Sequence, residues 1–418
     1  MNETCDTAQV TTQELVLDPF APAARRFAVP RLAGRPALYL LATLVVSLLA
    51  ASAAPTPLYA TYAQRWGFTP VTTTEVFGVY AVAVLASLLT LGRLSDHVGR
   101  RPVLLVALAV QAGSLLVFTT AAGVPGLFAA RIVQGLSTGA ALGAIGAGMI
   151  DIDRERGALA NAMSPGMGTG SGALLSGLAV RFLPAPTHLI YLVLLGVLVV
   201  QATGVALMRE TVTRSTGALT SLAPDVRVAR SVRPQLLAAA PVLFAVWALA
   251  GLYGALGPAL VQALTGSADV VLGGLSLTVL TAAAVASIFA LRTAAAGTVL
   301  LTGIGALVAG VAVTLLALTL RSPAVFFAGT AISGAGFGSG FQGGIRLVVP
   351  RAAVHERAGV LSLLFVVSYL GMGIPAVAAG FLAVHGAGLV GAARYYGAAL
   401  IVLALLALSA LLRERKNS

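Results

Sequence analysis

The sequence predicts an all-α polytopic membrane protein, with twelve transmembrane helices arranged as two pseudo-symmetric six-helix bundles. Composition, the number of long apolar runs and a repeat between the two halves lead to this fold class. Hydrophobic residues make up 58% of the 418 residues and charged residues 10%, whereas soluble domains carry about 25% charged residues. The chain also lacks the alternation of apolar and polar residues that is typical of transmembrane barrels.

Apolar runs near the ~20 residues that a helix needs to cross a bilayer occur twelve times. The predicted spans are 37–62, 71–92, 103–122, 124–149, 158–181, 187–208, 236–262, 269–291, 298–320, 323–349, 358–383 and 389–412. Most connections are short, and the long exception, 209–235, contains five arginines. This loop leaves six spans on either side, which predicts two halves.

The predicted organisation is an N-terminal six-helix bundle and a C-terminal one, with polar segments before, between and after them. These parts are a disordered cytoplasmic arm at 1–36, the bundles at 37–208 and 236–412, a central loop at 209–235 and a tail at 413–418. One side of the predicted topology holds 21 of the 26 Lys and Arg residues. The positive-inside rule therefore predicts both termini in the cytoplasm and the protein in the inner (plasma) membrane of the cell.

The two halves resemble each other in sequence. Residues 134–139, QGLSTG, match 333–338, SGAGFG, at a shift of 199 residues, and Pro57 matches Pro258 at a shift of 201. Both matches keep the same order of spans and the same direction through the membrane. They predict a parallel repeat about an axis along the membrane normal.

A charged stretch, GRLSDHVGRR at 92–101, separates spans 2 and 3. Charges between two spans must lie at a membrane face. Gly92 and Gly99 allow tight turns there, and Asp96 is an anion that a helix N-terminus attracts.

Arg100 and Arg101 need acidic partners, which the inner end of span 4 offers. The candidates are Asp151, Asp153 and Glu155. The alternative is that these arginines only mark the cytoplasmic face.

Arg131 lies about seven residues into span 4, where an unpaired cation costs at least ~2.5 kcal/mol. It should face a wet cavity or a partner, unless it snorkels to the outer interface. Acidic residues within the spans are few, namely Glu75 and Asp269. Glu75 and Asp96 are therefore the candidate proton carriers.

Residues 92–105, GRLSDHVGRRPVLL, and 127–140, LFAARIVQGLSTGA, resemble the two signatures of the major facilitator superfamily. The resemblance covers essentially all of 37–412 and extends to the drug:proton antiporter branch. It implies that Asp96 and Arg100 form a conformational latch on the cytoplasmic side, and that Arg131 takes part in proton coupling. The glycines after Ser164-Pro165 do not reproduce the span-5 signature of the exporters, and span 1 lacks the acid of many proton-driven members.

The resemblance also implies that spans 1, 4, 7 and 10 line a central cavity, that 2, 5, 8 and 11 lie between the halves, and that 3, 6, 9 and 12 lie outside. The predicted cavity has these polar or aromatic residues: Tyr59, Tyr62, Gln134, Trp247, Tyr253, Gln262 and Gln342. Such a lining suits a hydrophobic or amphipathic molecule better than a sugar, which needs many hydrogen-bond partners.

The sequence contains no Walker loop, no metal-ligand spacing and a single cysteine, Cys5, so we expect no enzyme activity, no cofactor and no metal. The arginines are spread among short connections, which argues against nucleic acid. The expected partners are a small-molecule substrate, protons and the lipid bilayer, for a monomer. The expected function is proton-coupled efflux of a drug- or antibiotic-like molecule by alternating access. Uptake of a metabolite, and a membrane sensor or scaffold that does not transport, remain alternatives.

Overall fold

The computed structural model describes residues 31–224, 232–267, 269–353 and 357–417, and in these ranges every regular element is a helix. The first half contains α1 (Arg35–Ala53), α2 (Pro55–Trp66), α3 (Pro70–Leu91), α4 (Ser95–Val98), α5 (Arg100–Thr120), α6 (Val124–Ile152), α7 (Arg154–Phe182) and α8 (Pro186–Leu207). After the short η1 (Thr220–Leu222), the second half contains α9 (Arg233–Ala255), α10 (Gly257–Thr265), α11 (Val270–Ala290), α12 (Ala296–Leu320), α13 (Pro323–Val348), η3 (Val349–Arg351), α14 (Arg357–His385) and α15 (Gly388–Asn417). Cys5 and most of the predicted arm lie outside the described residues.

The predicted all-α membrane class is confirmed. Eleven helical segments of the described chain are long and apolar enough to cross a membrane, with α1 and α2 forming one of them. The twelfth predicted span is α7, whose 29 residues reach about 43 Å at 1.5 Å per residue. Its many glycines make α7 less apolar, and it packs between α1 and α11 rather than facing lipid on all sides.

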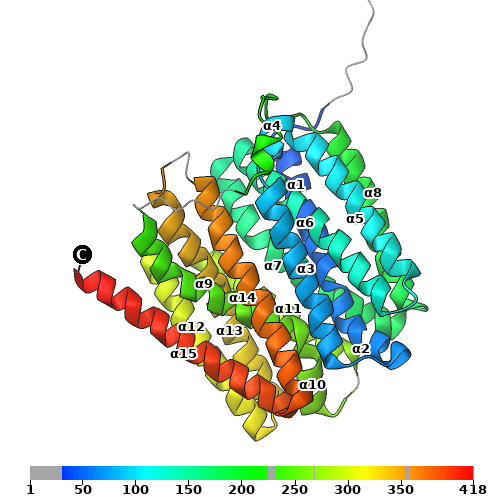
Figure 1. Ribbon diagram of the computed structural model, residues 1–418, viewed down its shortest axis with the longest axis vertical. Helices are drawn as coiled ribbons and strands as arrows, with labels where there is room; N and C mark the ends of the chain where they lie inside the picture. Colours follow the sequence, from blue (N-terminus) through cyan, green and yellow to red (C-terminus); the bar gives the residue numbers. More distant parts are fainter. Residues whose placement is uncertain (1–30, 225–231, 268, 354–356, 418) are drawn as a thin grey trace, which may run out of the picture.

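The two halves repeat the same helix packing (Figure 1). The fourth span of each half, α6 or α13, packs on the second and third spans, and the first span packs on the fifth. Two glycines one turn apart on the fourth span face two carbonyl oxygens of the second span. The pairs are Gly135 on Tyr80 and Gly139 on Val84, then, 199 or 200 residues later, Gly334 on Leu280 and Gly338 on Ala284. Close backbone approach of this kind requires small residues, so the sequence repeat reflects a repeated contact.

The halves meet along a seam made by α3 and α7 on one side and α14 and α11 on the other. These are spans 2, 5, 11 and 8, the spans expected between the halves. A hydrogen bond of 3.0 Å from the Thr278 hydroxyl to the Gly170 carbonyl and an ion pair of 2.7 Å between Arg181 and Asp269 both cross this seam. Each half also has its own apolar core.

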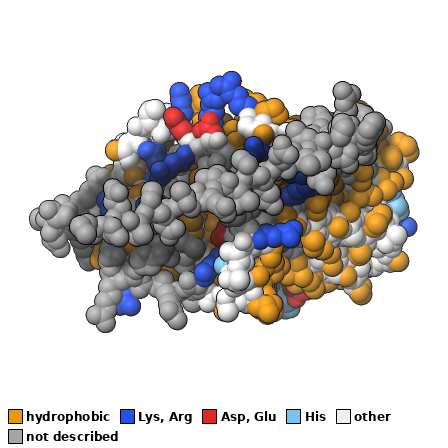
Figure 2. Space-filling view, turned by 90° about the horizontal axis from the view of Figure 1, so that it is seen from above, with side chains coloured by type: hydrophobic (Ala, Val, Ile, Leu, Met, Phe, Trp, Pro, Cys, Tyr) orange, Lys and Arg blue, Asp and Glu red, His pale blue; other side chains and the backbone are white. Residues whose placement is uncertain are grey.

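The bundle has two distinct ends (Figure 1). Helix α4 and η1 lie at one end, here called the α4 end, and α2 and α10 lie at the other, here called the α10 end. At the α4 end, Leu32 forms a β-bridge with Met208, so the segment before α1 is tied to the end of α8. Blue Lys and Arg side chains gather on the α4 end in Figure 2.

Candidate functional site

Arg131 forms the most completely enclosed charged site that the structure describes. Its side chain projects from α6 and is 0% exposed. The guanidinium donates to the Tyr59 hydroxyl from Nε at 2.9 Å and from Nη2 at 2.7 Å. Its Nη1 donates to the Ser52 carbonyl and to Gln134 Oε1, both at 2.7 Å. The side chain ends on these partners in the first half, so it does not reach an interface.

The site is built on the interruption between α1 and α2. Pro55 has no N–H, so the Ala51 carbonyl cannot receive its usual helical hydrogen bond. The Gln134 amide donates to this carbonyl instead, at 3.1 Å. Arg131 reaches the next carbonyl, that of Ser52. Side chains of the fourth span thus satisfy backbone oxygens of the first span inside the membrane, where no water would do so.

The charge of Arg131 has no acidic partner among the described residues. Three aromatic rings surround the guanidinium instead. Its Cζ lies 5.7 Å from the centroid of Tyr59, 5.1 Å from that of Tyr80 and 5.9 Å from that of Phe118. Neutral oxygens and ring faces stabilise the cation but leave its charge uncompensated. The first half therefore carries a fixed positive charge close to the seam.

A second cluster lies at the seam itself and is centred on Trp247 of α9. The Trp247 ring centroid lies 4.9 Å from that of Tyr369 in α14, and 6.2 Å and 5.5 Å from those of Phe337 and Phe341 in α13. Tyr369 packs with Tyr80 of α3 in the other half. We call these five residues the aromatic seam cluster. Because Tyr80 also contacts Arg131, the cluster and the charged site adjoin each other.

The charged stretch at the α4 end brings Arg100 together with two of its predicted partners. Arg100 pairs with Asp96 and, at 3.3 Å, with Asp151 at the end of α6, and it donates to the Ser95 hydroxyl at 2.7 Å. Its side chain is 8% exposed although it is charged. All these groups belong to the first half. Glu155 is exposed in the first turn of α7.

Glu210 is a member of this site that the sequence analysis missed. Its carboxylate accepts hydrogen bonds from the backbone N–H of Arg100 at 2.8 Å and of Arg101 at 3.0 Å. These N–H groups begin α5 and have no partner within the helix, so an anion there is favourable. Gly99 has a positive φ of 104° and lets the carboxylate approach. The one signal in the sequence was an acid directly after span 6, in a basic loop.

The remaining predicted residues are dispersed. Gly92 ends α3 and its backbone contacts Gly143. Glu75 is exposed on α3, on the same side of the helix as the exposed Val82. Tyr62 points into the first half, where its hydroxyl donates to Tyr191 at 3.3 Å.

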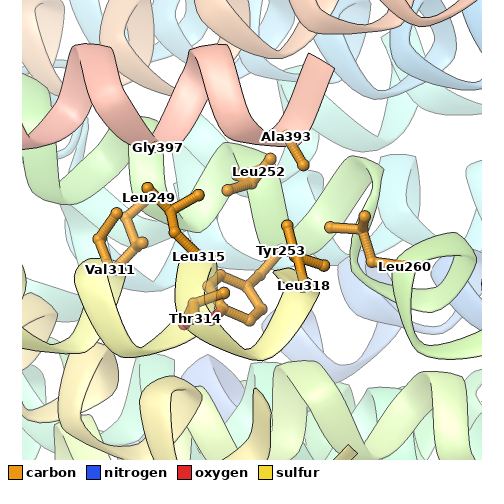
Figure 3. Close-up of a pocket in the computed structure, with 10 residues that line it drawn as sticks. All are labelled: Leu249, Leu252, Tyr253, Leu260, Val311, Thr314, Leu315, Leu318, Ala393 and Gly397. Atoms are coloured by element: carbon orange, nitrogen blue, oxygen red, sulfur yellow. Dashed lines mark hydrogen bonds between the residues drawn. The ribbon is translucent and has the colours of Figure 1, made fainter. Parts of the chain in front are cut away.

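Two predicted cavity residues of the second half lie away from the seam cluster. Gln262 is exposed on α10. Tyr253 lies inside the second half, where its hydroxyl is 3.1 Å from those of Thr314 and Thr330. It lines a small, almost wholly apolar pocket that Figure 3 shows between α9, α12 and α15. With about 10 Å³ for the centre of a water molecule, this pocket holds at most one water and is not a substrate cavity.

The fold and these sites define a helical membrane transporter built from two similar bundles. The family model of the Major Facilitator Superfamily matches residues 39–319, and the chain belongs to this superfamily. The fold is similar to that of a mutant form of the nucleoside transporter NupG, with a TM-score of 0.70 and 12% identity over 90% of this chain and 99% of that chain. It is also similar to the human organic anion transporter MFSD10 (TETRAN), with a TM-score of 0.63 and 17% identity over 88% and 99% of the two chains.

Proposed function

We propose that this transporter is a proton-coupled exporter of a hydrophobic or amphipathic small molecule and that it works by alternating access, as in the drug:proton antiporter branch. The observation that supports it most is the uncompensated charge of Arg131 at the interruption of α1 and α2. Charges in a low-dielectric interior interact strongly, so a proton bound near Arg131 is destabilised and tends to leave. Movement of α6 relative to the other half would change that effect and so couple proton release to transport.

An apolar cargo is supported by the aromatic seam cluster, which lies where the two halves meet. Rocking of the halves about the seam would expose the cluster first to one end and then to the other. We place the α4 end and both chain termini in the cytoplasm and the protein in the cell's inner membrane, because basic residues gather at that end (Figure 2).

Purified protein in proteoliposomes should move an amphipathic dye against its concentration gradient when the lumen is acidic. Collapse of the pH gradient by a protonophore should stop this movement, whereas valinomycin, which changes only the electrical potential, should leave part of it. Dye accumulation in acid-loaded vesicles is the measurement. Movement that does not respond to the pH gradient would contradict proton coupling, and movement only in the opposite direction would indicate uptake.

Asp96→Asn should separate a transporter from a scaffold. Asp96 is half exposed, so loss of its charge should change stability by less than about 1 kcal/mol. The pair with Arg100 would weaken, and we expect transport to fall about tenfold, a change of about 1.4 kcal/mol in the barrier. Asp153→Asn is the matched control: Asp153 caps α7 by accepting from the Arg156 N–H at 3.0 Å, and Asn caps equally well. Equal flux in both variants would remove the latch role of Asp96.

A further inference from the structure

The aromatic seam cluster is more than apolar packing, because its rings come from four helices of both halves. Helices α9, α13 and α14 contribute Trp247, Phe337, Phe341 and Tyr369, and α3 contributes Tyr80. Trp247, Phe337 and Phe341 are only partly buried although they face one another. Part of each ring face is therefore available to a further group at the seam.

Two polar atoms at this place have no partner among the described residues. Trp247 Nε1 is a buried donor without an acceptor, and Gln342 Oε1, one residue after Phe341 on α13, is a buried acceptor without a donor. A buried polar atom without a hydrogen bond costs about 1–3 kcal/mol. The indole N–H is the more informative of the two, since it can only donate. It fits a ligand that carries a hydrogen-bond acceptor.

The electrostatics of the cluster exclude a cationic ligand. The guanidinium of Arg131 lies 5.1 Å from the Tyr80 ring centroid. Among the described residues, no carboxylate pairs with that guanidinium. Aromatic faces alone would attract a cation, but the fixed charge behind Tyr80 opposes it and favours a neutral or negative group.

We propose that the aromatic seam cluster is the substrate site and that the substrate is a planar aromatic compound with hydrogen-bond acceptors and without a positive charge. The proposal rests on the transport function proposed above in that it names the cargo. The flat ring stacks at Trp247 and Tyr369, one of its acceptors receives the Trp247 N–H, and the charge of Arg131 rejects cations.

Trp66 and Trp247 are the only tryptophans of the chain, which makes a direct test possible. In the Trp66→Phe protein, Trp247 is the single tryptophan. Anthracene-2-carboxylate, a planar aromatic anion whose absorption overlaps tryptophan emission, should quench Trp247 by energy transfer as it binds. Perhydroanthracene-2-carboxylate has the same charge and a similar carbon frame but no ring face. We expect it to compete about tenfold more weakly, which corresponds to the worth of one or two aromatic pairs.

Site variants are tested with the tritiated anthracene-2-carboxylate on purified protein, without any proton gradient. We expect Trp247→Leu to weaken binding about tenfold, and Trp247→Phe, which keeps a ring but loses the N–H, to weaken it about threefold. Trp66→Leu is the matched control at the α10 end, where Trp66 stacks on Tyr62, and should bind normally. A thermal unfolding curve for each variant separates lost binding from lost folding, and Trp247→Phe serves if Trp247→Leu does not fold.

Three results would overturn the proposal: equal binding of the aromatic and saturated carboxylates, tighter binding of trimethyl(anthracen-2-yl)ammonium than of the anion, or no binding of the anion at all. Failure of the transport function looks different. Binding of the anion to Trp247 without proton-driven flux would uphold the site and refute the function. Flux of non-aromatic dyes that the anion neither enters nor inhibits would uphold the function and refute the site.

Discussion

Replacement of Arg131 by alanine is expected to abolish transport and to lower the free energy of unfolding by about 3 kcal/mol. The substitution leaves the Ser52 carbonyl, the Tyr59 hydroxyl and Gln134 Oε1 without their donor. All three oxygens lie in the membrane interior, where no water replaces the lost hydrogen bonds. The interruption between α1 and α2 would lose the group that holds it to α6.

Arg131→Lys separates charge from geometry. A lysine ammonium keeps the positive charge but has one nitrogen, whereas the guanidinium spreads its donors over three. It cannot bridge the Ser52 carbonyl and the Tyr59 hydroxyl as Arg131 does. We expect a stability between those of the wild type and Arg131→Ala, and transport about tenfold slower than that of the wild type.

The pseudo-symmetric position provides the control. Thr330 stands 199 residues after Arg131 and donates to the Tyr253 hydroxyl at 3.1 Å in the second half. Thr330→Ala should cost about 1 kcal/mol and leave transport intact, because it removes no charge. Thermal unfolding and proteoliposome flux of the four proteins are the measurements. Wild-type flux in Arg131→Ala would show that Arg131 only supports the helix interruption.

The fold could be predicted from the sequence because its causes are additive over long segments. Apolar length predicts the spans, and the shift of 199 residues predicted a repeat that the structure shows as equivalent contacts, such as Gly135 on α3 and Gly334 on α11. The sequence pattern also contained α7, although its glycines lower its hydropathy. Helix–helix contact, rather than lipid, covers these glycines.

The site could be predicted only in part, because its partners are backbone atoms and ring faces. The insertion cost of a cation predicted that Arg131 needs a partner, but no pattern marks the Ser52 carbonyl as that partner. Tyr59 and Tyr62 are three residues apart on one helix, yet Tyr59 contacts α6 and Tyr62 contacts α8. The interruption at Ala54 sets these directions. Tyr369, like Tyr80, was missed because apolar seams contain aromatics without any sequence signature.

Gly172→Val is expected to be the most damaging substitution of a small residue on α7. A Cβ at Gly172 would lie 2.2 Å from the Ala50 carbonyl oxygen and 2.5 Å from its Cα. These are backbone atoms of α1, so no side-chain rotation relieves the overlap. Overpacking of this kind costs about 3 kcal/mol at the upper end of its usual range. We expect little folded protein and a thermal midpoint well below that of the wild type.

Gly196→Val is the control, because a Cβ at Gly196 on α8 has no neighbour within 4 Å. The same change of residue in a spanning helix should leave the yield and the thermal midpoint nearly unchanged. Size-exclusion chromatography and thermal unfolding in one detergent compare the variants. Equal midpoints for Gly172→Val and Gly196→Val would show that α1 and α7 are not packed as closely as described.

The opposite face of α7 should behave differently, because it meets the other half of the protein. A Cβ at Gly170 would lie 2.5 Å from the Thr281 hydroxyl of α11, and this is a side-chain atom that can rotate away. Gly170→Ala should therefore fold, while roughness at the seam slows the motion between the halves. Wild-type stability with reduced flux is the expected result. Reduced stability with normal flux per folded molecule would assign this face of α7 to static packing and remove the sliding seam from the mechanism.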